Sequence, residues 1–304
     1  MKVVAFGGGH GLSASLRALR QVPELEITAV VTVADDGGSS GRLRAERGVL
    51  PPGDLRQALA ALAGDDAGAR LFQYRSGGAD PLAGHPVGNL VLTGLMELHR
   101  DPVDALEAAA ELLRVSGRVL PMSRVPLSIA ADVRDEDGAV RPVRGQHAVA
   151  ITRGHVEAVR IMPAEPPACT EVLAAVETAD WLIFGPGSWY TSVIPHLLVP
   201  QLAGAIQASP ALRLVTLNLA AEKETASLSL PDHLGALTRY LPGLRVDVVL
   251  ADGKAVGDPE PVDRAAESLG ARLVLAPVAV DDGGPRHDPS ALAAALSGIL
   301  AAGR

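Results

Sequence analysis

The stretch KVVAFGGGHGLS, residues 2–13, decides the fold. Its apolar first half is typical of a buried strand, and the glycine turn at 7–11 leads into a helix predicted over residues 12–20. A second apolar run, residues 26–33, follows and ends in Asp35-Asp36-Gly37-Gly38. A strand, a glycine turn, a helix and a second strand together predict a βαβ unit with parallel strands.

Strands and helices continue to alternate on both sides of a hairpin-rich middle. Further helices are predicted at 55–63 with Asp54 as N-cap, at 87–99, from Asp101-Pro102 to about 115, at 169–178, and in a stretch to about 207. Further strands are predicted at 181–184, 213–217, 246–250 and 272–275, and short ones at 118–120, 127–133, 139–143, 148–152 and 156–162. The pattern predicts one α/β domain over residues 1–304, with a mostly parallel sheet and an antiparallel β insertion at about 118–162.

The composition excludes several classes of protein. With 48% hydrophobic and 20% charged residues, the 304-residue chain is not of the disordered class. A net charge of −8 and only 3% aromatic residues argue against a nucleic-acid surface. The apolar runs are too short for a membrane span or a signal peptide, and the single Cys169 supplies neither a disulfide nor a cysteine zinc site. We therefore expect a cytoplasmic protein.

The first glycine loop is a candidate phosphate site. Glycines allow close backbone approach, and the following helix offers free N–H groups and the positive end of its dipole. The candidate residues are Gly7, Gly8, Gly9, His10, Gly11, Leu12 and Ser13. The alternative is a tight turn without a ligand. The loop is not a Walker motif, because the Gly-Lys-Ser/Thr ending is missing.

Three more polar stretches add candidates. After the second strand, Asp35 and Asp36 suit a ribose hydroxyl or Mg²⁺, whereas a solvated turn is the alternative. The other candidate ligand residues of this part of the chain are Ser39, Ser40, Arg42, Asp54, Arg56, His85 and Asn89. After the strand at 181–184, backbone amides and hydroxyls predict an anion pocket made by Gly185, Gly187, Ser188, Tyr190, Thr191 and Ser192, with a capped helix start as the alternative.

Six motifs in order resemble the YvcK-like gluconeogenesis factors, which share a fold with the CofD-like 2-phospho-L-lactate transferases. The motifs are GGGHGLS, VTVADDGGSSGRLR, PPGDLRQAL, GHPVGNL, ADWLIFGPGSWYTSVIP and NLAAEKET. The resemblance implies a Rossmann-like fold with helices on both faces of the sheet, a cytoplasmic location and binding of UDP-sugars such as UDP-N-acetylglucosamine. It also implies a role in cell shape and cell-wall synthesis, and it adds Asn218 to the candidate site residues.

The chain departs from this family where His10 replaces a threonine and where Ala221-Glu222 replaces a Thr-Gln pair. Two functions stay open. As a nucleotide-sugar-binding regulator, the protein would need no cofactor. As a transferase that moves a phospholactyl-type group to a deazaflavin hydroxyl, it would hold Mg²⁺ through Asp35 and Asp36. The sequence leaves open a homo-oligomer, a regulatory protein partner and whether any reaction is catalysed, whereas a nucleic-acid partner and a membrane span are not expected.

Overall fold

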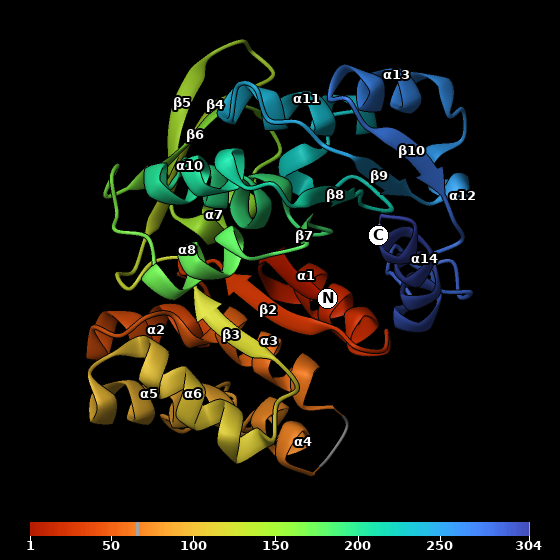
Figure 1. Cartoon of the computed structure of the whole chain (residues 1–304). Helices are drawn as coiled ribbons and strands as arrows, with labels where there is room; N and C mark the ends of the chain where they lie inside the picture. The colour runs from red at the N-terminus through yellow and green to blue at the C-terminus, as the bar shows by residue number, and fades with distance from the viewer. Residues whose placement is uncertain (65–66, 304) are drawn as a thin grey trace.

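A parallel β-sheet forms the centre of the protein (Figure 1). The structure is a computed structural model that describes residues 1–64 and 67–303. The strands of the sheet are β1 (Lys2–Gly7), β2 (Glu26–Val31), β3 (Arg118–Pro121), β7 (Trp181–Phe184), β8 (Leu212–Thr216), β9 (Val248–Ala251) and β10 (Arg272–Leu275). Within the described residues their order is β10-β9-β8-β7-β1-β2-β3, and neighbours run parallel. The predicted fold class is confirmed.

The direction in which the chain adds strands reverses at β1. From β1 the chain moves to β2 and β3 on one side, whereas β7 to β10 follow one another on the other side. Val3 of β1 is in register with Ile27 of β2 and with Trp181 of β7. In open α/β sheets, ligands bind outside the carboxyl ends of the strands at such a reversal, so the loops after β1 and β7 frame the expected site.

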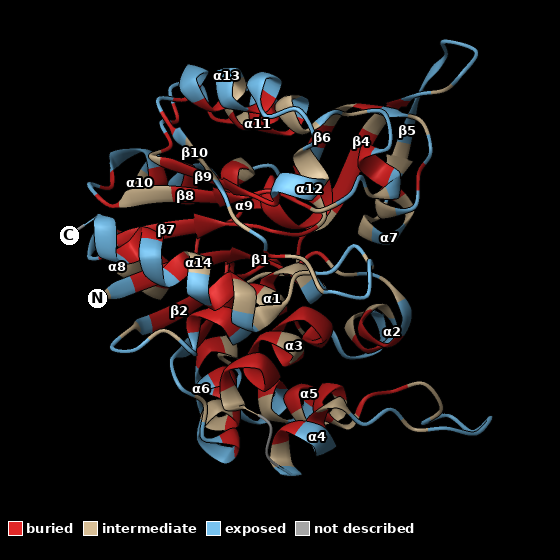
Figure 2. Cartoon of the chain, turned by 90° about the vertical axis from the view of Figure 1, so that its right-hand side faces the viewer, coloured by how far each residue is buried: buried red, intermediate tan, exposed pale blue. Residues whose placement is uncertain are grey.

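Helices cover both faces of the sheet. Their bounds are α1 (Gly9–Leu19), α2 (Gly38–Arg47), α3 (Pro52–Ala63), α4 (Ala67–Gln73), α5 (Val87–His99), α6 (Pro102–Leu113), α7 (Gln146–Ala150), α8 (Thr170–Glu177), α9 (Pro195–Leu198), α10 (Pro200–Ala208), α11 (Leu230–Tyr240), α12 (Gly253–Val256), α13 (Glu260–Ser268) and α14 (Pro289–Ala302), with a π-helical turn η1 (Trp189–Val193) and a 3-10 turn η2 (Lys223–Thr225). In Figure 1, α14 lies to the right of the sheet and α8 and α10 to its left. Strands β1, β7 and β9 are almost entirely buried between these layers (Figure 2), as expected for parallel strands covered on both faces.

A small antiparallel sheet stands beyond the carboxyl ends of β1 and β7 (Figure 2). It contains β4 (Ser128–Arg134), β5 (Val140–Arg144) and β6 (His155–Met162), in the order β5-β4-β6. These strands confirm the antiparallel element that the turns of the middle segment predict. The division of the chain into domains stays a prediction.

Two predictions for this insertion are wrong, one in the sheet to which a strand belongs and one in the type of element. The strand at 118–120 is β3 of the main sheet, where Val119 pairs in parallel with Ala29 of β2 after the crossover through α6. The strand predicted at 148–152 is largely the short helix α7. A short apolar run fits a strand and a buried helix equally well, so periodicity could not separate them.

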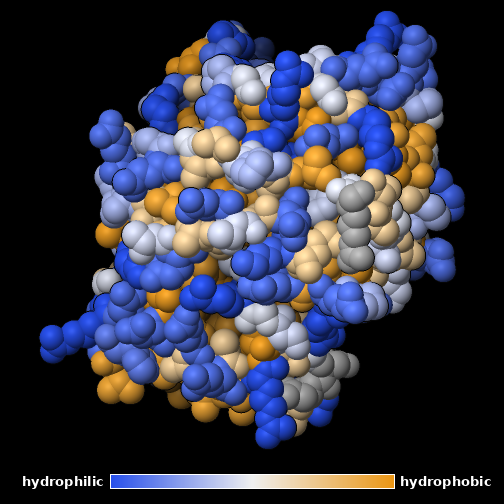
Figure 3. Space-filling view, in the orientation of Figure 1, coloured by the Kyte–Doolittle hydropathy of each residue, from blue (hydrophilic) through white to orange (hydrophobic). Residues whose placement is uncertain are grey.

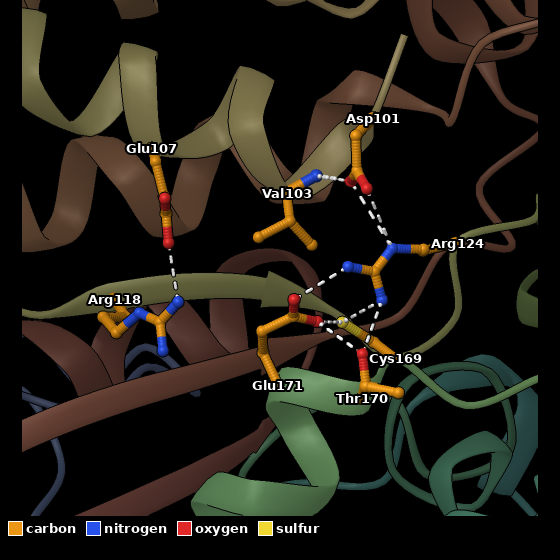
Figure 4. A network of polar contacts seen from close by, with 8 residues as sticks. All are labelled: Asp101, Val103, Glu107, Arg118, Arg124, Cys169, Thr170 and Glu171. Atoms are coloured by element: carbon orange, nitrogen blue, oxygen red, sulfur yellow. Dashed lines mark hydrogen bonds and ion pairs between the residues drawn. The ribbon is translucent and has the colours of Figure 1, made fainter. Parts of the chain in front are cut away.

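Arg124 joins three chain segments by polar contacts (Figure 4). Its guanidinium contacts Asp101 at 3.3 Å, which caps α6, and Glu171 at 2.8 Å in the first turn of α8. Cys169 is fully buried beside them, and burial raises the pKa of its thiol to about 11. The thiol is therefore in its unreactive protonated form.

Hydrophilic side chains cover most of the face shown in Figure 3, with apolar residues in small groups among them. Among the described residues, no helix is both long enough and apolar enough to cross a membrane.

Candidate functional site

A cleft of about 780 Å³ opens where the loops after β1, β7 and β8 meet. It also touches α3, α7 and the segment at 280–289. Its lining includes eleven of the predicted site residues: Gly8, Gly9, His10, Gly11, Ser13, Asp54, Gly187, Ser188, Thr191, Ser192 and Asn218. The cleft therefore lies at the reversal of strand order, where ligand sites of open α/β sheets are found.

The glycine loop is packed so tightly that two of its positions have no room for a side chain. A β-carbon at Gly11 would lie 2.3 Å from the carbonyl oxygen of Pro186 and 2.5 Å from the α-carbon of Gly187. A β-carbon at Gly8 would lie 2.5 Å from Thr32 and 2.6 Å from Oδ2 of Asp54. The start of α1 thus rests directly on the backbone of the β7 loop, and the glycines at positions 8, 9 and 11 expose backbone to the cleft. The backbone amide of Gly9 interacts with the side chain of Asp54.

Asp54 places a buried carboxylate at the edge of this glycine loop. The side chain is only 7% exposed, and within the described residues its Oδ2 has no hydrogen-bond partner. Burial and the neighbouring charge of Asp35 raise the pKa of Asp54 well above its usual range. The predicted N-cap role is wrong, because α3 begins at Pro52 and Asp54 lies inside its first turn. A buried polar atom without a partner is costly, so this oxygen is a candidate ligand contact.

The β7 loop is held by the loop after β8. Asn218 accepts a hydrogen bond from the amide of Gly187 at 2.8 Å and donates one to its carbonyl at 3.0 Å. The amide of Tyr190 donates to Oε1 of the buried Glu224 at 2.8 Å. Part of the predicted anion pocket is therefore already filled by a carboxylate of the protein itself, and the Tyr190 ring packs against Tyr240 outside the cleft.

Several of the other predicted residues form a buried polar network behind the cleft. Ser39 is hydrogen-bonded to His85 at 2.8 Å and accepts from Asn89 at 2.9 Å. Asn89 in turn accepts from Arg56 at 2.8 Å, and Arg56 also donates to Gln73, which lines the cleft. These four residues, Ser39, His85, Asn89 and Arg56, do not line the cleft. We therefore interpret them as residues that position its wall.

The remaining predicted residues also lie outside the lining of the cleft. Gly7 ends β1, Leu12 is buried in the core, Gly185 begins the β7 loop with its carbonyl hydrogen-bonded to Ser15, Ser40 packs beside Gly53, and Arg42 donates to the carbonyl of Ala83. The lining contains residues that sequence reasoning missed, among them Arg17, Gln57, Gln73, Gln146, Glu222, Arg286 and His287. Of these, only Glu222 carries a signal in the sequence, because it departs from the family pattern.

The adjacent acids Asp35 and Asp36 have different surroundings. Asp35 accepts from the amide of Gly37 at 3.0 Å. Both oxygens of Asp36 are engaged by α7, through the amides of Gln146 at 3.1 Å and His147 at 2.9 Å. The described residues contain no group of three or more His, Cys, Asp or Glu side chains that could hold a metal ion. Because both oxygens of Asp36 already accept from α7, Asp35 is the better placed of the predicted pair. Its neighbour Asp54 adds a second carboxylate of the kind that Mg²⁺ uses beside substrate phosphates, and the Mg²⁺ site stays a prediction.

We expect the Asp36→Asn variant to loosen α7. Asparagine has one side-chain oxygen, so one of the two backbone amides of α7 loses its acceptor and the other keeps an uncharged one. The expected loss is about 1 kcal/mol, or roughly fivefold in local opening. Hydrogen exchange of the amides at 146–150 measures it. Unchanged protection there would show that the carboxylate does not hold the helix.

Comparison with known proteins extends this picture. The family model described as "2-phospho-L-lactate transferase CofD" matches residues 3–283. The chain belongs to the CofD family. A protein from Mycobacterium tuberculosis, named "Putative gluconeogenesis factor", is 50% identical over 310 residues, which cover 98% of this chain and 90% of the relative. The "Gluconeogenesis factor" of Listeria innocua is 36% identical over 312 residues and covers 98% of this chain and 95% of the relative.

The crystal structure of a UPF0052 family member from Bacillus halodurans has the same fold. It is 34% identical, covers 97% of this chain and 98% of that chain, and superposes with a TM-score of 0.86. The resemblance of the six motifs to gluconeogenesis factors and to the CofD-like superfamily is thus confirmed.

Proposed function

We propose that this CofD-family protein binds a nucleotide sugar, in particular a UDP-sugar such as UDP-N-acetylglucosamine, and acts as a regulator. The observation that carries the proposal is the unpartnered, buried Oδ2 of Asp54 beside the glycine loop. A carboxylate at this place accepts hydrogen bonds from ribose or sugar hydroxyls, as acidic residues do in dinucleotide sites.

The order of groups along the cleft supports the same ligand class. The loops follow the strand order β8-β7-β1-β2, so Glu222 after β8 and Asp54 after β2 flank the glycine loop and the start of α1. Amides at a helix N-terminus favour a phosphate, and the two acids favour hydroxyl donors. A nucleotide sugar presents the matching sequence of ribose hydroxyls, diphosphate and sugar hydroxyls. A volume of about 780 Å³ is within the range of small-molecule sites.

The relatives' names support a role in gluconeogenic growth, and we propose that ligand occupancy reports sugar-nucleotide supply to cell-shape and cell-wall synthesis in the cytoplasm. The binding function requires no cofactor.

The second candidate is a transferase, which the description of the matching family model favours. In this function the group moved is of the phospholactyl type and the acceptor is a deazaflavin hydroxyl. Asp35 and Asp54 would hold Mg²⁺, which would neutralise charge on the transferred group. The few aromatic side chains of the chain disfavour a deazaflavin face.

Titration calorimetry with UDP-N-acetylglucosamine, with Mg²⁺ and with EDTA, separates the two candidates. For the binding function we expect metal-independent affinity that falls about five- to thirtyfold in Asp54→Asn, because an amide is a weaker acceptor than a carboxylate. Asp104→Asn, the same change on the exposed side of α6, is the matched control and should have no effect.

Two outcomes would contradict this assignment. Affinity that requires Mg²⁺, together with product formed from a nucleotide-activated phospholactate and a deazaflavin, would favour the transferase. Affinity that is identical in wild type and in Asp54→Asn would remove Asp54 from the site.

A further inference from the structure

We infer that Glu222 determines which sugars the cleft accepts, by holding a carboxylate against the sugar side of the ligand and repelling sugars that carry an acid group. The inference rests on the proposed function and names a narrower ligand class: nucleotide sugars whose sugar is neutral.

Glu222 is built into the wall of the cleft. Its Oε2 accepts a hydrogen bond from the hydroxyl of Ser188, and both side chains line the cleft. The backbone of Glu222 is fixed by Thr225, whose hydroxyl accepts from the Glu222 amide at 3.1 Å and whose side chain is fully buried. The carboxylate therefore projects from a rigid turn.

The position of this carboxylate follows from the contacts of the β7 loop. Ser188 directly follows Gly187, the residue against which Gly11 of α1 packs. A phosphate bound at the start of α1 thus has the Ser188–Glu222 pair as its neighbour toward β8 and Asp54 as its neighbour toward β2. The ring of the ligand that lies on the β8 side of the phosphate is therefore next to the charge of Glu222.

The carboxylate of Glu222 is not held in an ion pair. Among the described residues, Glu222 forms no ion pair, although Arg17 and Arg286 line the same cleft, and the next acid along the chain, Glu224, is buried close by. An unpaired carboxylate suits hydroxyl and amide donors, whereas a second carboxylate would have to approach it with like charge. Specificity of this kind is obtained by repulsion of the wrong ligand as much as by attraction of the right one.

The test compares UDP-glucose with UDP-glucuronate, which differ by the acid group at C6 of the sugar. By calorimetry at low salt we expect wild type to prefer UDP-glucose by about tenfold or more, and Glu222→Gln to reduce that preference to about threefold or less, mainly by improved binding of UDP-glucuronate. Glu177→Gln removes one charge from the exposed end of α8 and should keep the wild-type preference.

A second measurement needs no variant. Because salt screens the repulsion, the wild-type preference should shrink as ionic strength rises from about 0.05 to about 0.5 M. Equal affinity of wild type for both ligands, or a preference unchanged by Glu222→Gln and by salt, overturns the role of Glu222 while the proposed function stands. Failure of wild type to bind either of these two UDP-sugars overturns this inference, and failure to bind UDP-N-acetylglucosamine as well overturns the proposed function.

Discussion

Replacement of Gly11 by alanine is expected to destabilise the protein and to abolish ligand binding. The added methyl group would lie 2.3 Å from the carbonyl oxygen of Pro186 and 2.5 Å from the α-carbon of Gly187, both backbone atoms. Overpacking of this kind costs about 1–3 kcal/mol, which outweighs the gain of about 1 kcal/mol that alanine brings to a helix interior. The start of α1 and the β7 loop have to separate, so the donors that face a ligand phosphate are displaced.

The measurement is the free energy of unfolding in urea together with UDP-sugar affinity. Gly94→Ala is the matched control, because Gly94 lies in the interior of α5, is exposed and has no atom within 4 Å of the added group. This control should gain about 0.5–1 kcal/mol and bind normally. A Gly11→Ala protein that is as stable as Gly94→Ala and binds its ligand would show that the two loops can part at no cost.

The contrast between these glycines explains how much of the fold could be predicted. The apolar runs that became β1, β2 and β7 are bounded by glycine turns, so the parallel sheet and the position of the first loop follow from local pattern. The sequence alone does not distinguish Gly11 from Gly94. A side chain at Gly11 would collide with Pro186, whereas one at Gly94 would have no atom within 4 Å. That difference depends on a partner more than 170 residues away in the chain.

The candidate site was predictable to the same extent. Residues directly after β1 and β7 line the cleft because all parallel strands end at one edge. The polar stretch after β2 was harder to place, because Asp36 turns to cap α7 and Ser39 turns into a buried network. Polar residues bind a ligand or one another with the same atoms, and only tertiary structure decides between these partners.

Glu224 is the clearest case of such an internal partner. Its side chain is 1% exposed, its Oε1 accepts from the amide of Tyr190, and within the described residues its Oε2 has no partner. Burial raises the pKa of Glu224 to about 7, against the opposing effects of the Tyr190 amide and of the hydroxyl and amide of Thr191. Ionisation of Glu224 therefore lowers the stability of the folded state, although this carboxyl also holds the β7 loop through the amide of Tyr190.

Replacement of Glu224 by glutamine is expected to make the protein more stable than wild type at pH 8 and not at pH 4.5. In the unfolded chain the carboxyl ionises near pH 4.3, whereas the folded protein keeps its proton to about pH 7. Between these values the folded state binds more protons, so wild-type stability falls as pH rises, by up to about 4 kcal/mol in total. Glutamine does not titrate and keeps an acceptor for Tyr190.

The measurement is the difference between the urea midpoints of wild type and Glu224→Gln. Asp54 contributes a loss of the same sign to both proteins, so its effect cancels in that difference. That difference should grow from pH 4.5 to pH 8, whereas Glu177→Gln should give a constant offset. Parallel stability curves for wild type and Glu224→Gln would mean that the carboxyl is ionised and satisfied in the folded protein.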